Sequence, residues 1–458
     1  MSSSDYKEVI TGFDLTPFSN LTADQEIWLR NLVRHVDIES LSLRLGGSQN
    51  AYVEPIAFFD EKSSRWWAGR FVGELTYQNR TLRLLPRFGL STLIRWLSRI
   101  WGFKISSSKG TYQHDHIWLW EIIARLWTIR LLIAAKHGLP YTRIEETHIG
   151  LTARGRLKIR ETALTSKTAQ RALVSSSRNR KLNPLISGTV ISAFYCLRRQ
   201  LLHIGNESLW LTNRGKYLVD ELRATVSKQD VLHAQSGNKV IRYTPITEGY
   251  RAVVELSRSI IRQQPISSST QGGKEVFGIL LDMAEIWELY VYNLLKLGLQ
   301  DFMVMHTGRI EENMAWLLRS SRSLEKTQKL RPDILIYNRT QNRCLYVVDA
   351  KYKRTSKSSD NPTGIQREDL YQMAAYLSAF GDNKTMLEGS LVYPTDDESS
   401  ICSYFEPNNP WDLNKTNRRL NFFSVDAKDL HEGGLNGSEI KFLEVVQASI
   451  NREGRETS

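Results

Sequence analysis

Two short strand-like runs in the C-terminal part of this 458-residue chain constrain its fold most strongly. They are Pro332–Tyr337 and Leu345–Lys351, and the polar segment between them has the length of a hairpin turn. Pairing them as antiparallel neighbours brings Asp333 and Lys351 to the same end of a sheet. Period-two alternation places Asp349 on the same face as Lys351. The sequence therefore predicts a β-hairpin that gathers two carboxylates and an ammonium group.

These three side chains suit phosphodiester chemistry. Asp333 and Asp349 offer the hard oxygen ligands that Mg²⁺ prefers, and Mn²⁺ can substitute. Such an ion activates water and neutralises charge that develops on phosphorus. Lys351 would orient the water or stabilise the transition state as a point charge. The alternative is a surface ion pair at a strand end, which would contribute little stability. For the ordered set of three residues we favour the metal site.

Pro332-Asp333 followed by Asp349-Ala350-Lys351 resembles the PD-(D/E)xK nuclease signature, with aspartate in the acidic slot. The resemblance implies a restriction-endonuclease-like α/β domain with a mixed sheet. Downstream, Gln372 and Tyr376 resemble the Q-x-x-x-Y helix motif of several branches, and their spacing places both on one helix face. The resemblance implies that these two residues position the DNA strand or the active-site lysine.

An amphipathic helix is predicted over Ile279–Leu297, upstream of the hairpin. It resembles the helix that precedes the sheet in these nucleases, whose acidic residue often reaches the metal. The resemblance assigns that role to Glu288. Asp282 and Glu285 compete for the same role on this helix, with a solvated surface position as the alternative.

The chain carries 61 Lys+Arg against 49 Asp+Glu, a formal charge of +12. Residues 151–270 alone hold 20 basic and 7 acidic residues, a net of +13, so the remainder sums to −1. Such a basic block indicates a polyanion partner, and nucleic acid is the usual one. The candidate phosphate contacts are Arg154, Arg156, Arg178, Arg180 and Lys181. The alternative for any one of them is an ordinary solvated surface position.

The sequence pattern predicts a multidomain α+β/α/β protein. The expected regions are an N-terminal β-containing domain (1–110), a helical basic middle domain (111–265) and a C-terminal nuclease domain (274–458). Alternating runs over Phe71–Tyr77 and Leu82–Leu85 predict a hairpin in the first region. Gln263–Gly273 is typical of a linker.

Several classes of protein are disfavoured by the sequence. The three cysteines are too few and too scattered for a disulfide framework or a cysteine zinc site, which favours a cytoplasmic location. We expect no signal peptide, and the most apolar long segment, Ile117–Ala135, is interrupted by charges that a membrane span would have to bury. Gly272-Gly273-Lys274 lacks the upstream glycine of a phosphate-binding loop, so we expect this chain to bind no nucleotide.

Taken together, these features resemble the McrC family, the nuclease subunits of modified-cytosine restriction systems. Shorter segments, Thr81–Gly89 and Gly155–Thr162, also resemble family segments. The resemblance implies an anti-phage endonuclease subunit that docks through its N-terminal domain on an McrB-like hexameric AAA+ GTPase, stimulates hydrolysis and cuts double-stranded DNA. Two alternatives stay open: a non-cutting adaptor that activates an NTPase ring, and an enzyme that acts on RNA or on free ends.

Overall fold

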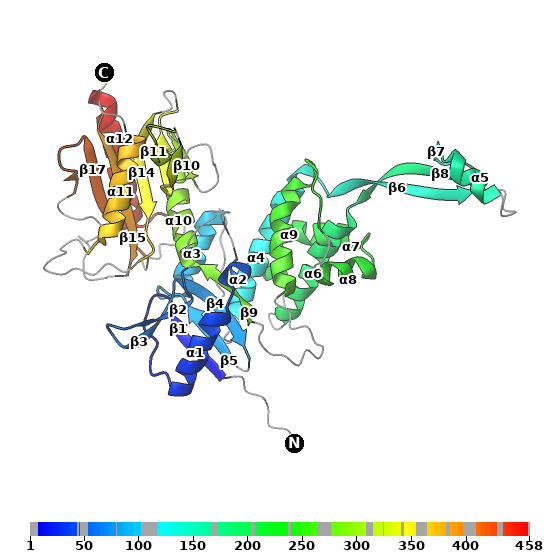
Figure 1. The fold of residues 1–458 in the computed structure, drawn as a ribbon, viewed down its shortest axis with the longest axis horizontal. Coiled ribbons are helices and arrows are strands. Elements are labelled where there is room, and N and C mark those ends of the chain that lie inside the picture. Colours follow the sequence, from blue (N-terminus) through cyan, green and yellow to red (C-terminus); the bar gives the residue numbers. More distant parts are fainter. Residues whose placement is uncertain are drawn as a thin grey trace. The chain divides into compact units, whose positions relative to one another are not determined.

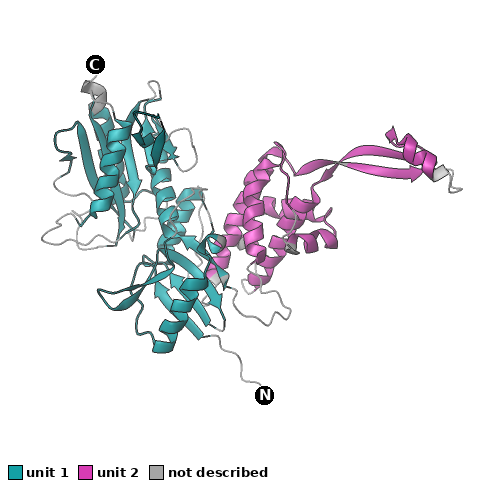
Figure 2. Ribbon diagram, viewed as in Figure 1, with its two compact units in different colours: residues 1–108, 271–458 teal, residues 109–270 magenta. Residues whose placement is uncertain are grey.

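The computed structural model divides into two compact units, residues 1–108 with 271–458 and residues 109–270 (Figures 1 and 2). The residues that the structure describes are 8–43, 45, 54–78, 80–101, 117–166, 172–202, 207–236, 240–262, 276–307, 315–323, 325–339, 343–353, 364–381, 385–396, 409–427 and 434–456. The expected N-terminal and nuclease regions both belong to the first unit. The expected middle region belongs to the second. The predicted linker, Gln263–Gly273, lies outside the described residues.

A four-stranded sheet in the first unit combines segments that are far apart in the sequence. Its order is β1 (Glu8–Phe13), β5 (Arg80–Leu85), β4 (Phe71–Tyr77) and β9 (Val276–Asp282). β1 is parallel to β5, and the other neighbours are antiparallel. The β4–β5 pair confirms the predicted N-terminal hairpin, with β5 beginning at Arg80.

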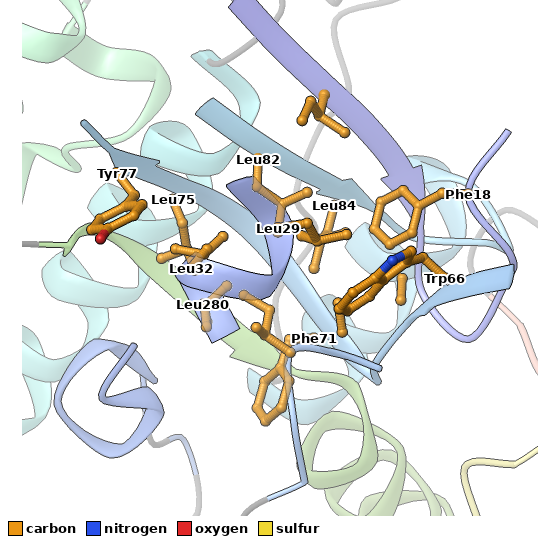
Figure 3. Close-up of a cluster of buried hydrophobic side chains, with 14 of the residues drawn as sticks. Phe18, Leu29, Leu32, Trp66, Phe71, Leu75, Tyr77, Leu82, Leu84 and Leu280 are labelled. Atoms are coloured by element: carbon orange, nitrogen blue, oxygen red, sulfur yellow. The ribbon is translucent and has the colours of Figure 1, made fainter. Parts of the chain in front are cut away.

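One hairpin and two helices accompany this sheet. They are β2 (Ala57–Asp60) with β3 (Arg65–Ala68), α1 (Ala23–His35) and α2 (Ile38–Leu41). α3 (Leu90–Trp101) packs instead against the C-terminal part of the chain, where its Trp96 contacts Trp287. Thr22 and Gln25 start α1 with a reciprocal capping box, which satisfies backbone N–H groups of the first turn. The helix then buries Leu29 and Leu32 against the sheet, and Figure 3 shows Leu29 beside Leu82 and Leu84, and Leu32 beside Leu75. Burial of this apolar face holds the N-terminal part together.

The helix predicted over Ile279–Leu297 begins later than expected. α10 spans Met283–Gly298, because the Asp282 side chain caps its first turn and the preceding residues form β9. β9 pairs with β4 along its whole length. A Cβ atom at Gly278 would lie 2.1 Å from the Glu74 carbonyl oxygen, so this close pairing requires glycine. The apolar pattern alone did not distinguish strand from helix over these residues.

The second sheet of this unit is mixed, as the sequence predicts. Its order is β10 (Met303–His306), β13 (Ile334–Tyr337), β14 (Cys344–Ala350), β15 (Leu387–Thr395), β17 (Arg418–Asp426) and β16 (Trp411–Asp412). β14, β15 and β17 are parallel, and the outer pairs are antiparallel. The β13–β14 pair confirms the predicted hairpin. β11 (Ala315–Arg319) and β12 (Lys326–Leu330) form a separate hairpin.

Helices cover both faces of the mixed sheet. α11 (Arg367–Phe380) packs Met373 and Leu377 into the cluster that contains Phe422. α12 (Gly437–Glu456) packs Phe442 edge-on against Phe423, which points to the opposite face of β17. This arrangement matches the predicted α/β architecture.

The second unit contains a sheet as well as helices, so the prediction of a helical middle region was incomplete. Its helices are α4 (Ile117–Ala134), α6 (Pro184–Gln200), α7 (Asn213–Arg223), α8 (Lys228–Ser236) and α9 (Arg251–Arg262). The strands are β6 (Tyr141–Gly150), β8 (Leu173–Leu182) and β7 (Arg156–Leu157). Figure 1 shows β6 and β8 extending from the helices as a long ribbon, with β7 and α5 (Ile159–Ser166) at its far end.

Among the described helices, none is both long enough and apolar enough to cross a membrane.

Candidate active site

The two predicted carboxylates meet where strands β13 and β14 adjoin. The antiparallel register pairs Ile334 with Val348. Asp333, which precedes β13, therefore lies beside Asp349 near the end of β14. Asp333 Oδ2 accepts a 2.7 Å hydrogen bond from the Ala350 N–H. Asp349 is only 1% exposed, and its Oδ2 atom has no aligned hydrogen bond among the described residues.

Lys351 extends from the end of β14 into the same place. Its Nζ atom lies 2.6 Å from Asp349 Oδ2 and donates a 2.7 Å hydrogen bond to Gln372 Oε1. Its backbone N–H donates to the Val392 carbonyl of β15, which continues the sheet pairing past the end of β14. Hydrogen bonds and an ion pair thus fix both the backbone and the side chain of Lys351.

Charge repulsion and burial act on this cluster together. Burial, followed by the negative charges of Glu288 and Asp349, raises the pKa of Asp333 well above its ordinary value. Burial lowers the pKa of Lys351, but the attraction of Asp349 and Asp333 outweighs it, so the pKa is raised. The folded state therefore binds the Asp333 proton more tightly than the unfolded chain does. In the absence of a cation, this carboxyl destabilises the fold as pH rises through its raised pKa.

Of the three acidic candidates on the upstream helix, the structure brings only Glu288 into the cavity with the hairpin carboxylates. Asp282 caps α10 and pairs with Arg70 at 3.0 Å. Both carboxylate oxygens of Glu285 accept hydrogen bonds from the Leu45 N–H. Glu288 Oε1 also lies 2.6 Å from His306 Nε2. The structure thus places Glu288, and neither Asp282 nor Glu285, in this cavity.

The two residues predicted on one helix face do lie together on α11. Gln372 Nε2 donates a 2.6 Å hydrogen bond to the Tyr376 hydroxyl, which donates to the Arg331 carbonyl at 2.9 Å. Gln372 also accepts from Lys351. Tyr376 therefore contacts the cluster through Gln372 and anchors the chain segment just before Asp333.

A cavity of about 900 Å³ is lined by Asp333, Asp349, Lys351, Glu288 and Gln372. Its charged lining residues are Glu54, Arg70, Glu288, Arg331, Asp333, Asp349, Lys351, Lys353, Glu368 and Asp369. Six acidic and four basic side chains give a formal charge of −2, which a divalent cation would balance. Among the described residues, no group of three or more His, Cys, Asp or Glu side chains is arranged to hold a metal ion.

The sequence interpretation missed Lys353 and Asp369. Lys353 Nζ donates to Asp369 Oδ1 at 2.8 Å, and the same oxygen lies 3.9 Å from Lys351 Nζ. Asp369 is 2% exposed and also accepts from the Tyr393 hydroxyl. A signal was available, since Lys353 follows Lys351 at the two-residue spacing of one strand face.

The five predicted nucleic-acid contacts lie elsewhere, on and beside strands β7 and β8 of the second unit. Arg154, Arg156 and Arg178 are exposed. The Arg180 guanidinium lies 4.2 Å from the centre of the Tyr141 ring. Lys181 is paired with Glu146. The last two side chains therefore have partners within their own sheet.

Comparison with known proteins identifies the family. The family model described as McrBC 5-methylcytosine restriction system component matches residues 67–394, more than half of the chain. No curated protein matches. A chain in the half-complex of Thermococcus gammatolerans McrB AAA+ hexamers with bound McrC is similar in fold, with a TM-score of 0.53 at 14% identity over 96% of this chain and 99% of that one. The T. gammatolerans McrBC complex gives a TM-score of 0.36 at 15% identity over 64% and 88%. This chain therefore belongs to the family of McrBC 5-methylcytosine restriction system components.

Proposed function

We propose that this chain is a Mg²⁺-dependent DNA endonuclease subunit of an McrBC-like restriction complex. The observation that carries the proposal is the convergence of Asp333, Asp349 and Lys351 at the end of one hairpin. The mixed sheet and its flanking helices suit the PD-(D/E)xK domain that the sequence motif implies. Membership of the McrBC family supports a role in restriction.

The partner in this proposal is an AAA+ GTPase hexamer, on which the chain docks and whose hydrolysis it stimulates. The support is the fold likeness to a chain from a structure of McrB AAA+ hexamers with bound McrC. The absence of a phosphate-binding loop motif from the sequence agrees with a subunit that relies on a separate motor. We retain the N-terminal region, residues 1–110, as the proposed docking region.

The donor set of the cavity fits Mg²⁺. This ion commonly takes one or two protein carboxylates and completes its octahedron with water and phosphate oxygens, so a group of three protein ligands is not required. Asp333 and Asp349 would hold it, and the buried Asp349 Oδ2 already lies 2.6 Å from the positive charge of Lys351 Nζ. Glu288 faces the same cavity and contributes negative charge at Asp333, so it would attract the ion without completing a group of three direct ligands. When bound, Mg²⁺ would supply Lewis-acid stabilisation of the scissile phosphate.

The remaining residues have separate roles in the proposed cleavage. Lys351 stays an ammonium group and presents its N–H donors to the attacking water or to a phosphate oxygen. Gln372 fixes the position of Lys351 through its 2.7 Å hydrogen bond. Tyr376 fixes Gln372 in turn. Removal of one of these hydrogen bonds would therefore leave the Lys351 side chain less firmly oriented, while the carboxylates keep their positions.

Addition of Mg²⁺ or Mn²⁺ should raise the melting temperature of the isolated protein. The ion would relieve repulsion between Asp333, Asp349 and Glu288, and binding to the folded state alone stabilises it by about 2.7 kcal/mol at a free concentration of about 100 Kd. Differential scanning fluorimetry with and without the ion measures this shift. Asp349→Asn should reduce the shift strongly. Equal shifts for both proteins would place the ion elsewhere.

Charge reversal at Arg154, Arg156 and Arg178 should weaken DNA binding and flatten its dependence on salt. If all three side chains bind phosphates, the slope of log K against log salt should change by about 0.9 for each phosphate that the variant no longer binds. Fluorescence anisotropy with a duplex at several salt concentrations measures the slope. Reversal at Arg214, Lys216 and Lys228, which are exposed on α7 and α8, is the matched control. An unchanged slope for the first variant would assign the β7–β8 residues to protein contacts or solubility.

A further inference from the structure

An aromatic pair lines the candidate active-site cavity and has no role in the metal chemistry. The β2–β3 hairpin places Phe58 directly opposite Trp67, and both side chains line the cavity with Asp349 and Lys351. Phe58 is 41% exposed, although phenylalanine side chains are usually buried. The pair therefore forms an apolar wall in a cavity whose other lining is mostly charged.

The β2–β3 hairpin packs on the N-terminal hydrophobic cluster through the face opposite to Phe58 and Trp67. The apolar wall is therefore not part of that core. Trp66 of β3 is buried in the N-terminal hydrophobic cluster, where Figure 3 shows it beside Phe18. Neither Phe58 nor Trp67 belongs to that cluster. Trp67 Nε1 donates a 3.1 Å hydrogen bond to Ser63 Oγ, which restrains the indole orientation. The structure thus presents a restrained aromatic surface on a hairpin fixed from behind.

The chemistry of the cavity indicates what this surface contacts. The two lysines Lys351 and Lys353 suit a phosphate group, and so would a cation held by the carboxylates. In a nucleic acid, each phosphate is joined through a sugar to a flat base. Bases stack on aromatic side chains without strong sequence preference, since every base has a π-face. A cavity of about 900 Å³ has room for the phosphate and its attached nucleoside.

We propose that Phe58 and Trp67 form a stacking subsite for a nucleobase of the strand whose phosphate lies at Asp349 and Lys351. This inference rests on the proposed nuclease function and adds the way in which the strand is held. A base on this wall has left the stack of its duplex, so the site engages a locally unstacked strand. The energy of stacking on the wall offsets part of the cost of unstacking.

The test compares two single-stranded probes on the full-length Asp349→Asn chain, in which cleavage does not interfere with binding. One probe is a thymidine oligonucleotide of about 12 nucleotides, and the other is the same sugar-phosphate backbone without bases. Fluorescence anisotropy gives both affinities. The chain should bind the thymidine probe at least about tenfold more tightly than the abasic probe. The double variant Phe58→Ala with Trp67→Ala should lose that preference. The abasic probe should bind equally well to the chain with and without the two aromatic rings.

Two further variants control for structure. Phe59→Ala removes an equally exposed phenylalanine from the opposite face of β2, where it contacts Trp66, and should preserve the preference for bases. Trp67→Phe keeps an aromatic ring and should preserve most of it. If the double alanine variant fails to fold, Phe58→Ser alone still predicts a reduced preference.

Photocrosslinking gives an independent readout. A probe that carries 5-iododeoxyuridine should attach to Phe58 or Trp67 on irradiation, as located by peptide mass spectrometry. Crosslinks only to other regions, or a base preference that survives removal of both rings, would overturn the proposal. So would unchanged probe binding together with abolished GTPase stimulation, which would assign the wall to the protein partner. If binding depends on the bases but the wild-type complex cuts no DNA, the stacking subsite would stand and the proposed nuclease function would be overturned.

Discussion

Asp349→Asn should eliminate DNA cleavage by the complex while the protein stays folded. The substitution keeps the shape of the side chain but removes the negative charge that would hold the ion, and catalytic electrostatic contacts of this kind are worth on the order of 10³-fold in rate. Stability without metal should stay equal or rise slightly, since one of the repelling carboxylates is removed next to Asp333. Plasmid cleavage in the presence of the motor measures the activity, and thermal unfolding confirms the fold.

Asp412→Asn provides the matched control. It makes the same chemical change on β16 of the same sheet, at a side chain that is 72% exposed and paired with Arg419. This variant should cut at the wild-type rate. Undiminished cleavage by Asp349→Asn would exclude the proposed metal site. That outcome would favour another centre in the complex, with this chain as an adaptor.

Lys351→Ala should separate cleavage from stimulation of the motor. The lysine side chain lies inside the cavity, 14% exposed, and contacts Asp349 and Gln372. A side chain that lies inside this cavity offers little surface to a protein ring. Cleavage should therefore fall about 10²-fold to 10³-fold, as when a transition-state donor is removed, while the GTPase rate stays within about twofold of the wild-type complex.

Steady-state GTP hydrolysis and plasmid cleavage are measured on the same preparations. Lys351→Met is a useful second variant, because it keeps most of the side-chain volume beside the buried carboxylate. Lys326→Ala, on the exposed strand β12, should change neither activity. Loss of GTPase stimulation in a normally folded Lys351 variant would contradict the division of labour between docking and cutting.

This test uses the whole chain for a structural reason. A fragment that starts near residue 273 would contain β9 but not its partner β4, and the buried side chains of Ile279 and Leu280 would lose their cover. Failure of such a fragment would report a broken sheet rather than a missing docking surface. Point variants inside the cavity leave the shared sheet intact.

The sequence determined the features that depend on local pattern. Two hairpins were predictable because alternation of period two and a short polar turn specify antiparallel pairing within a few residues. The hairpin then brings Asp333 beside Asp349, and the helical spacing of Gln372 and Tyr376 places them on one face of α11. These contacts join residues close in sequence, so a single segment carries the information.

Only the tertiary structure decided the start of α10 and the choice among its acidic residues. The apolar run before Met283 suits a strand or a helix equally, and pairing with β4, about 200 residues earlier, makes it a strand. Arg70 engages Asp282, and the Leu45 N–H engages Glu285, which leaves Glu288 facing the cavity. The same distant N-terminal part supplies the aromatic wall. Contacts between residues so far apart in sequence produce no periodic pattern within either segment, because the two segments meet only after the chain has folded.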